Sequence, residues 1–460
     1  ASLQISPRVG FNWDVNNDET LQVRGGTGLF QGPPPFVWIS NQASNSGMAL
    51  FGSITNGTGY MFSPDIDKYR PTPTPGLSKS YSLNVTDPNY KFPQVWKSTL
   101  AVDKKVLGWT VTAEGTYIKN INATVFQNLA LPSEGNTTLS DGRTRFVKRS
   151  VYDATGTAQT ATNPNIGNAI YMTNANIGYT LFGTLQVQRQ FKNLAVNASY
   201  TRQTAVDATI NGSTAFTMWG ARPTGTDPNN FEAGFSNNYL PHRIIASVNY
   251  GKELIKNTRT SIGLLYEASP NAPQSSLSYT YGGDINNDGF NGNDLIFVPK
   301  DASQIKLTNA SAVGGVADTR TQTELWNQLD AFISNNPYLS TRRGMMSERQ
   351  ALVLPWVHRL DLNFTQDVYI KVKDTKHTLR FTADVYNFTN FISKELGTQQ
   401  VPVTTTPLNF VKLDTDGKTP IFSFPYLDGR NKVPFTDSFR DNVGFGSRFQ
   451  IQLGVRYLFN

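Results

Sequence analysis

The stretch at 284–294, "DINNDGFNGND", carries oxygen-bearing side chains at the spacing of a calcium-binding loop. Such loops take ligands at positions 1, 3 and 5, a main-chain carbonyl at position 7 and an acid at position 12, with glycine at position 6. Gly289 falls at position 6, but the acid comes one place early and Leu295 stands at position 12. The spacing predicts a weak calcium site, suited to the millimolar calcium outside cells. The expected ligands are Asp284, Asn286, Asp288, Asp294 and the carbonyl of Phe290.

The same loop has a second interpretation that needs no metal. Asn and Asp side chains form Asx turns by accepting hydrogen bonds from the main chain two residues further on. A loop rich in Asn, Asp and Gly is able to hold its shape by such turns alone. Calcium in this loop is the one cofactor that the sequence suggests, and both interpretations stay open.

Apart from this loop, the sequence holds no set of residues suited to catalysis. It contains no cysteine and three histidines, which are far apart at His242, His358 and His377. Nucleophile–base pairs are therefore scarce, and disulfides and thiolate metal sites are excluded. We expect a protein that is not an enzyme.

The composition of the 460-residue chain favours a membrane protein built from strands. Aromatic residues make up 12% and charged residues 16%, whereas soluble domains carry about 25% charge. Lys and Arg are scattered and the net charge is +7, so nucleic acid is not an expected partner. No run of about 18 apolar residues occurs, which excludes a transmembrane helix. Transmembrane strands need only about 10 residues of alternating polarity.

That alternation is clearest at the C-terminus, in "RFQIQLGVRYLFN". Apolar residues occupy every second position from Phe449 to Phe459, and the residues between them are polar or small. A strand with lipid on one face and a wet lumen on the other needs this pattern. The sequence predicts about eleven such strands, near 5–15, 20–30, 93–105, 108–121, 177–191, 194–205, 242–252, 258–268, 356–370, 376–390 and 445–459.

The connections between these strands alternate between short turns and long loops. Short turns at one rim and long extracellular loops at the other are typical of a bacterial outer-membrane barrel. An odd number of strands does not close such a barrel, so residues 1–460 are expected to be the C-terminal part of a larger one, cut inside a loop. No signal peptide opens the chain, which predicts that the natural N-terminus lies upstream of Ala1.

Local structure is expected in three of the loops. The loop at 269–355 holds the Asp/Asn-rich segment and "TELWNQLDAFI", whose apolar spacing predicts a short helix with Thr323 as its N-cap. The loop at 391–444 holds a hairpin that turns at Asp416-Gly417. The Pro-rich segment "QGPPPFVWISNQ" at 31–42 is expected to be a packed loop over the barrel mouth.

By the alternation of the strands, four charged side chains on two neighbouring strands are predicted to face the lumen. They are Arg359, Asp361, Arg380 and Asp384. We expect ion pairs across the strands; the alternative is a luminal wall that binds a plug or guides a substrate. Three further charged residues, Arg8, Arg24 and Glu114, are expected to be similar but less clustered.

Several blocks of the chain, in order from about residue 5 to the end, resemble one family. They include "SPRVGFNWDVNNDETLQVRGGTGLF", "GYTLFGTLQVQRQFKNLAVNASYT", "PHRIIASVNY", "GGDINNDGFNGNDLIFVP", "NPYLSTRRG", "RLDLNFTQDV", "LRFTADVYNFTNF" and "GFGSRFQIQLGVRYLF". These blocks are similar to the C-terminal half of Oar-like TonB-dependent outer-membrane transporters. The resemblance implies an all-β fold, a transmembrane antiparallel barrel of about 22 strands, of which the chain supplies about eleven C-terminal ones.

The resemblance also implies a receptor in the outer membrane of a Gram-negative bacterium. A plug inside the barrel, ahead of this segment, would carry the TonB box and rearrange to let a substrate pass. The alternative is a structural or assembly barrel of a secretion or surface-lipoprotein complex. A third hypothesis is a passive porin, against which the family resemblance and the loop-rich mouth argue. The expected partners are outer-membrane lipid and lipopolysaccharide, TonB through the plug, and a surface lipoprotein or secretion complex.

Overall fold

The computed structural model describes most of the 460 residues. The described ranges are 5–32, 36–44, 61–65, 67–68, 81–147, 151–152, 158–159, 166–209, 212, 214–270 and 276–459. The prolines at 33–35 therefore lie outside the described residues, as do 45–60, 66 and 69–80 of the first long loop.

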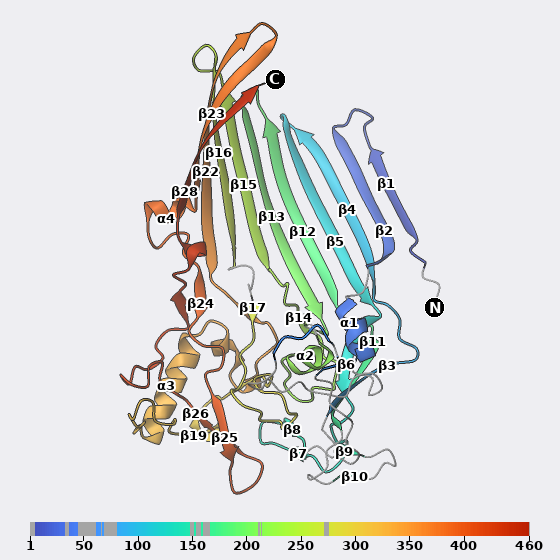
Figure 1. Cartoon of the computed structure of the whole chain (residues 1–460), viewed down its shortest axis with the longest axis vertical. Coiled ribbons are helices and arrows are strands. Elements are labelled where there is room, and N and C mark those ends of the chain that lie inside the picture. Colours follow the sequence, from blue (N-terminus) through green and yellow to red (C-terminus); the bar gives the residue numbers. More distant parts are fainter. Residues whose placement is uncertain are drawn as a thin grey trace.

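A single antiparallel sheet forms the main part of the molecule (Figure 1). Eleven long strands follow one another in chain order, and the two-residue β14 (Gly234–Phe235) pairs with the end of β13 as the twelfth strand. The long strands are β1 (Arg8–Asp14), β2 (Leu21–Gln31), β4 (Gln94–Val106), β5 (Trp109–Ile121), β12 (Tyr179–Gln190), β13 (Leu194–Asp207), β15 (His242–Lys252), β16 (Thr258–Pro270), β22 (Trp356–Val372), β23 (Thr375–Tyr386) and β28 (Gln450–Phe459). The eleven predicted strands are confirmed. Among the described residues β1 and β28 do not pair with each other, so the eleven strands form an open wall.

Short turns join the strands at one end of this wall. Between β4 and β5 only Leu107 and Gly108 intervene, because Val106 pairs with Trp109. Both turn residues have positive φ, 50° and 80°, which is the backbone of the two-residue turn that matches strand twist. Such tight turns fix the register of each hairpin, and so decide which side chains share a face.

One face of the wall is apolar and open to its surroundings. Large apolar side chains stand exposed on it along the strands, among them Phe11, Leu100, Leu185, Phe364 and Leu453. All three histidines lie on this face near strand ends, each bonded to a tyrosine of the adjacent strand: His242 to Tyr200, His358 to Tyr266 and His377 to Tyr457. The apolar face is the surface that lipid covers in a transmembrane barrel. No helix in the described part of the chain is long and apolar enough to cross a membrane.

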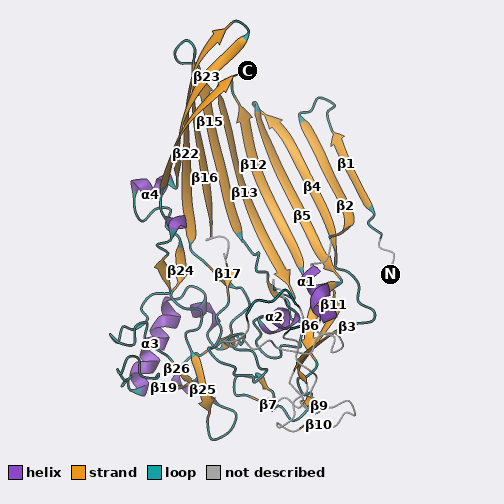
Figure 2. Ribbon diagram, viewed as in Figure 1, coloured by secondary structure: helices purple, strands orange, loops and turns teal. Residues whose placement is uncertain are grey.

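At the other end of the wall, the long connections pack together into a second region, here called the loop body (Figure 2). Its helices are α1 (Phe36–Ser44), α2 (Ala215–Gly220), α3 (Gln322–Asn335), η1 (Ala302–Gln304) and η2 (Leu339–Arg342). Its other strands are β3 (Tyr81–Thr86), β6 (Ala123–Asn128), β7 (Thr137–Thr138), β8 (Thr144–Arg145), β9 (Val151–Tyr152), β10 (Ala158–Gln159), β11 (Ile166–Ala175), β17 (Ser276–Leu277), β18 (Phe297–Val298), β19 (Lys306–Thr308), β20 (Met345–Met346), β21 (Leu352–Val353), β24 (Gln400–Pro402), β25 (Asn409–Leu413), β26 (Pro420–Ser423) and β27 (Phe439–Asp441). Two further helices are α4 (Phe388–Ile392), which lies beside β22 of the wall (Figure 1), and η3 (Phe445–Ser447).

The loop body holds two hydrophobic cores, and each draws on more than one connection. The larger joins Leu139, the segment from Tyr279 to Val298, helix α3 and the aromatic pair Phe422 and Phe424. The smaller packs β6 and β11 against α2, with Trp38 of α1 on its edge. Burial of apolar side chains is the main stabilising contribution to such a unit, so the long connections are mutually supporting rather than separate loops.

The structure confirms some of the local predictions for these loops and corrects others. The hairpin is confirmed: β25 pairs with β26, and Gly417 takes φ 68° at the turn. Helix α3 is confirmed, but its N-cap is Thr321, which forms a capping box with Glu324; the expectation of Thr323 is wrong because that residue lies inside the first turn. The segment at 31–42 was expected to be a packed loop; residues from Phe36 onward form helix α1, and Trp38 of this helix packs against the smaller core.

Candidate functional site

The Asp284 loop is folded by its own side chains. Asp284 accepts hydrogen bonds from the main-chain N–H groups of Asp288 and Gly289, at 3.1 and 2.9 Å. Asn286 accepts from the N–H of Asp288 at 2.9 Å, and Asp288 accepts from that of Phe290 at 2.7 Å. The bonds to Asn286 and Asp288 are Asx turns in series, and those to Asp284 close the loop over four and five residues. Gly289 takes φ 89° here, a conformation that favours glycine.

The side chains inside this loop are buried and hydrogen-bonded to one another. The second oxygen of Asp288 accepts from the amide groups of Asn286 and Asn293, at 3.0 and 2.9 Å. Asp294 is fully buried and accepts from the N–H of Ile285 at 3.1 Å. Its other oxygen forms an ion pair of 2.8 Å with Arg143, which belongs to a different long connection.

Burial also changes the acidity of these carboxyl groups. Desolvation raises the pKa of Asp294 to about 7, an effect that Arg143 opposes and that the neighbouring Asp288 and Asp284 increase. Desolvation likewise raises the pKa of Asp284 and of Asp288. A buried carboxylate is favoured only when it is paired or hydrogen-bonded, and Arg143 supplies the pairing for Asp294.

The arrangement favours the Asx-turn interpretation of the loop. Both carboxylate oxygens of Asp284, Asp288 and Asp294 already accept a hydrogen bond from the protein. Within the described ranges, no group of three or more Asp, Glu, His or Cys side chains is placed to hold a metal ion. Calcium binding by Asp284, Asn286, Asp288, Phe290 and Asp294 stays a prediction.

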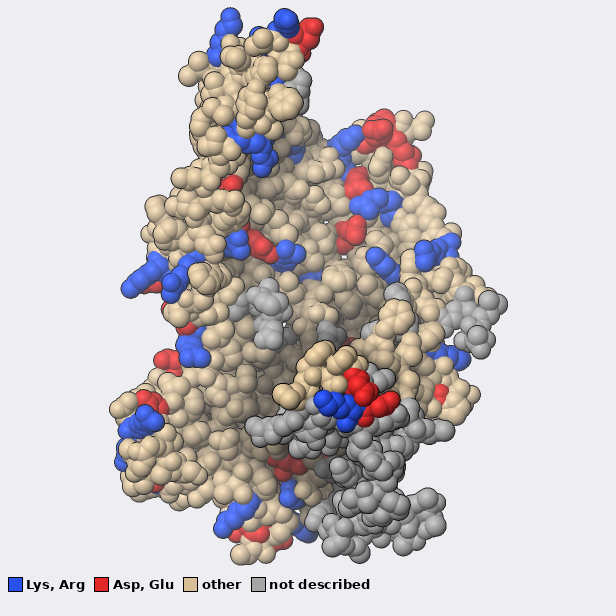
Figure 3. Space-filling view, viewed as in Figure 1, with Lys and Arg blue, Asp and Glu red and all other residues tan. Residues whose placement is uncertain are grey.

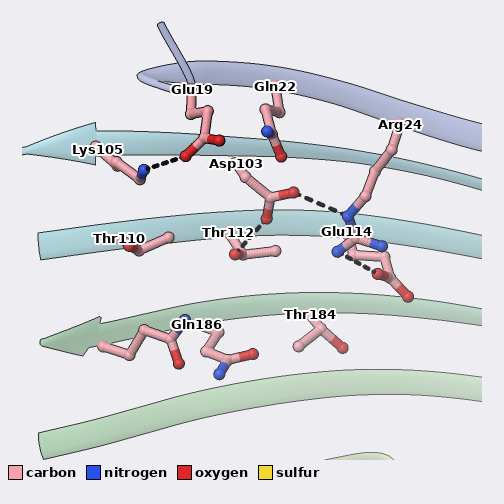
Figure 4. A pocket seen from close by; sticks show the side chains of 11 residues that line it. Glu19, Gln22, Arg24, Asp103, Lys105, Thr110, Thr112, Glu114, Thr184 and Gln186 are labelled. Carbon is pink, nitrogen blue, oxygen red and sulfur yellow. Dashed lines mark hydrogen bonds and ion pairs between the residues drawn. The ribbon is translucent and has the colours of Figure 1, made fainter. Parts of the chain in front are cut away.

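A second candidate site lies on the polar face of the main sheet. A hollow of about 500 Å³ is lined by side chains from the four strands β2, β4, β5 and β12 and from the turn before β2 (Figure 4). The lining residues are Glu19, Gln22, Arg24, Asp103, Lys105, Thr110, Thr112, Glu114, Thr184, Gln186 and Gln188. All of them are charged or carry hydroxyl or amide groups, so this surface is suited to water and polar partners.

Three of the charged groups in this hollow form a network. Arg24 of β2 lies 2.8 Å from Asp103 of β4 and 3.2 Å from Glu114 of β5. Thr112 donates a hydrogen bond to the second oxygen of Asp103 at 2.5 Å. The expectation that Arg24 and Glu114 are less clustered is therefore wrong, because strand register brings them together around Asp103. Arg8 lies apart from them, over the ring of Phe30.

The four predicted luminal charges share the polar face but pair differently from the prediction. Arg380 forms two contacts, of 2.7 and 2.8 Å, with Asp367, which lies directly opposite it on β22. Arg359 instead pairs along its own strand with Asp361, at 2.8 Å. Asp384 forms no ion pair among the described residues and accepts a hydrogen bond from Asn363.

The reason for this pairing lies in the register. The residue opposite Arg359 is Glu267, which Arg243 already holds at 2.8 Å, so Arg359 turns to the carboxylate two residues along. Cross-strand pairing is thus correct for Arg380 and wrong for Arg359. Asp103 and Asp367 were missed, although both stand at polar positions of the alternating pattern, because only the register shows which arginine each one faces.

Charged side chains on the visible surface occur in small mixed groups rather than in a patch of one sign (Figure 3). No wide basic surface therefore marks this view as a nucleic-acid site. The apolar outer face, the polar inner face, and the short and long connections at opposite ends together define an outer-membrane β-barrel protein.

The comparison with family models agrees with this class. The chain belongs to the outer membrane beta barrel domain family, whose model matches residues 2–406. It is accordingly a protein of the outer membrane of Gram-negative bacteria, as its sequence predicts.

Among solved structures, the chain is similar to the outer membrane transporter YddB from Escherichia coli. The two are 10% identical, with a TM-score of 0.40, over 91% of this chain and 39% of that one. It is also similar to a mutant of the ferric enterobactin receptor PfeA from Pseudomonas aeruginosa, at 10% identity and a TM-score of 0.27, over 98% of this chain and 56% of that one. The chain thus spans less than two thirds of either protein. No curated protein matches it.

Proposed function

We propose that the chain is part of an Oar-like TonB-dependent transporter that moves a substrate across the outer membrane. In this proposal the wall of eleven strands is one half of a larger barrel. A plug inside that barrel would rest against the polar face and rearrange when TonB pulls on it. The substrate would first meet the loop body.

The observation that supports this proposal best is the network of Arg24, Asp103 and Glu114. Arg24 is 42% exposed and Glu114 35% exposed, so both retain hydrogen-bonding groups that face the 500 Å³ hollow. Fixed charges on a partly hydrated wall suit a polar surface that docks and releases, because such contacts are strong enough to orient a partner and weak enough to break.

The loop body gives a second line of support. Its two cores hold the long connections together at one end of the wall. A packed mouth of this kind favours a receptor that captures a ligand before passage, whereas a passive porin needs an open mouth.

The alternative function is a structural or assembly barrel of a secretion or surface-lipoprotein complex. The same packed loop body favours it, because a rigid surface is suited to docking another protein. The two functions differ in what the full-length protein binds on its periplasmic and outer sides.

The test uses the full-length protein purified from outer membranes in mild detergent. Binding of the periplasmic domain of TonB, measured by calorimetry, is the result that the transporter proposal expects. Absence of that binding, together with a stoichiometric lipoprotein or secretion partner in the purified material, would replace it with the assembly function. A steady ohmic conductance in planar bilayers would instead identify a passive pore.

A further inference from the structure

A second hollow, of about 400 Å³, lies where the loop body meets the main sheet. On one side it is bounded by β14, which pairs with Val206 and Asp207 at the end of β13. On the other side are Leu295 and the segment from Arg342 to Arg349. The hollow therefore lies between a strand of the membrane wall and the longest loop.

Arg349 is the residue of this hollow with the most unsatisfied hydrogen-bonding capacity. Its side chain is 4% exposed. One terminal nitrogen, Nη2, contacts a carboxylate oxygen of Asp207 at 3.1 Å, the main-chain carbonyl of Asp207, and that of Gly234 at 3.2 Å. Its Nε and Nη1 are buried and have no acceptor among the described residues. Burial lowers the pKa of this guanidinium.

Two more arginines line the same hollow. Arg342 contacts Met346 and Glu348 through its terminal nitrogens, but its Nε is buried and finds no acceptor in the part of the chain that the structure describes. Arg222 is 4% exposed and donates to the carbonyls of Pro228 and Asn230. Burial, together with the charge of Arg349, lowers the pKa of Arg222 to about 10.

The acidic side chains near these arginines do not accept hydrogen bonds from Nε and Nη1 of Arg349 or from Nε of Arg342. Asp207 contacts Nη2 of Arg349, and Glu348, which is half exposed, lies 3.5 Å from Nη1 of Arg342. Glu232 accepts hydrogen bonds from Thr226 and Asn230. A guanidinium only donates, and a buried donor left without an acceptor destabilises the fold. Acceptor oxygens brought by a ligand would satisfy it.

We propose that this hollow binds an oxyanion, a carboxylate or a phosphate group, on a small molecule with an apolar part. Arg349 is the main donor and Arg342 a second one. Phe235, Met346 and Leu295 supply the apolar part of the lining. The inference rests on the proposed function only in regarding this ligand as the substrate to be transported.

A glycine gives a way to test the role of Arg349 without removing it. A Cβ at Gly234 would lie 2.6 Å from Nε of Arg349, closer than packed atoms allow, and 3.0 Å from the Cβ of Arg349, which is a tight contact. The substitution Gly234→Ala therefore displaces the guanidinium while leaving its charge in the protein.

The experiment measures binding to the whole protein in neutral detergent by calorimetry. The probes are phenyl phosphate, phenylacetate and the uncharged benzyl alcohol. We expect at least one of the two anions to bind about tenfold more tightly than the alcohol, the ratio that one charge-assisted hydrogen bond provides. Arg349→Gln and Gly234→Ala are each expected to weaken that binding by about the same factor.

The matched control is Arg343→Gln. Arg343 follows Arg342 in sequence, but its guanidinium contacts Asp330 and Ser334 of α3, outside the hollow, so anion binding should be unchanged. Equal binding of the alcohol, or unchanged anion binding in both Arg349→Gln and Gly234→Ala, would overturn the proposal. If Arg349→Gln does not fold, Gly234→Ala and Arg342→Gln decide the outcome. If the full-length protein binds the anions but not TonB, the transport proposal fails and the oxyanion site stands.

Discussion

Arg143 and Asp294 are 151 residues apart in sequence and form an ion pair of 2.8 Å with neither side chain exposed to solvent. Arg143 also donates to the carbonyl of Leu295 at 2.5 Å and lies 3.3 Å from Asp141. The pair ties the connection between β5 and β12 to the Asp/Asn-rich segment of the longest loop. The stretch at 284–294 is therefore held not only by its own hydrogen bonds but also by an ion pair with a distant segment.

We expect Arg143→Leu to destabilise this part of the loop body by about 3–5 kcal/mol, because a buried carboxylate loses its partner. Hydrogen exchange of residues 280–296 in the full protein measures the effect. The control is Arg343→Leu, which breaks an ion pair with Asp330 whose two side chains are 25% and 42% exposed; a loss of no more than about 1 kcal/mol is expected there. Similar losses in both variants would contradict the structural role of Arg143.

The stability of the same segment should decrease as pH rises from about 4 to about 7. The folded protein raises the pKa of Asp294 from its ordinary 3.8 to about 7, so the folded state binds this proton more tightly than the unfolded state. The stability that the protonated Asp294 contributes is complete below pH 3.8 and is lost as the pH rises through the folded pKa of about 7. Protection factors between pH 4 and pH 8, corrected for intrinsic exchange, measure this dependence.

Asp294→Asn should remove most of that pH dependence, while Asp330→Asn, on the exposed side of α3, should leave it in place. A slope that persists in Asp294→Asn would assign the titration to another group.

Removal of calcium by a chelator should leave the protection of residues 280–296 unchanged, since hydrogen bonds within the protein and the ion pair with Arg143 hold the loop in shape. Proteolysis of the full protein with and without chelator is the measurement, with magnesium added back as the control. Faster cleavage that calcium alone reverses would establish the metal site instead.

Thr321→Ala should weaken helix α3 by about 1 kcal/mol, the usual cost of a lost N-cap. Thr321 and Glu324 satisfy each other's main-chain N–H groups in a capping box. Exchange rates across Gln322–Asn335 report the change. Thr323→Ala is the matched control, because Thr323 is exposed in the first turn and does not cap the helix; equal effects would show that the cap contributes nothing.

On the polar face, Asp367→Asn should lower the free energy of unfolding by about 1 kcal/mol. The loss is small because Arg380 is partly exposed to solvent. The substitution breaks a two-pronged contact of 2.7 and 2.8 Å. Asp384→Asn removes a charge from the same face and the same neighbourhood, but leaves every ion pair intact. Urea unfolding in detergent should therefore separate the two variants, and identical midpoints would rule out a stabilising role for the Asp367 pair.

The strands of the wall were predictable because lipid on one side and water on the other impose strict alternation over ten or more residues. The cap of α3 was also within reach, since Thr321 and Glu324 have the spacing of a capping box, whereas Thr323 does not. Local rules suffice wherever neighbours in sequence are also neighbours in space.

The loop body was not predictable in this way. Nothing near Arg143 in sequence indicates that it faces Asp294, and nothing near Asp367 indicates that it faces Arg380. The metal-like spacing at Asp284 fixes which side chains carry oxygen, but it does not show whether those oxygens are already occupied by protein donors. Such facts depend on register and on packing between distant segments.

The shared cores of the loop body have a consequence for engineering and for sequence drift. Leu139, helix α3 and Phe424 come from three different connections yet pack into one cluster. A single loop transplanted into another barrel would lose its apolar partners, and a large insertion in one connection would disturb the other two. The surface of the loop body should therefore change as a set, with substitutions in one connection compensated in another.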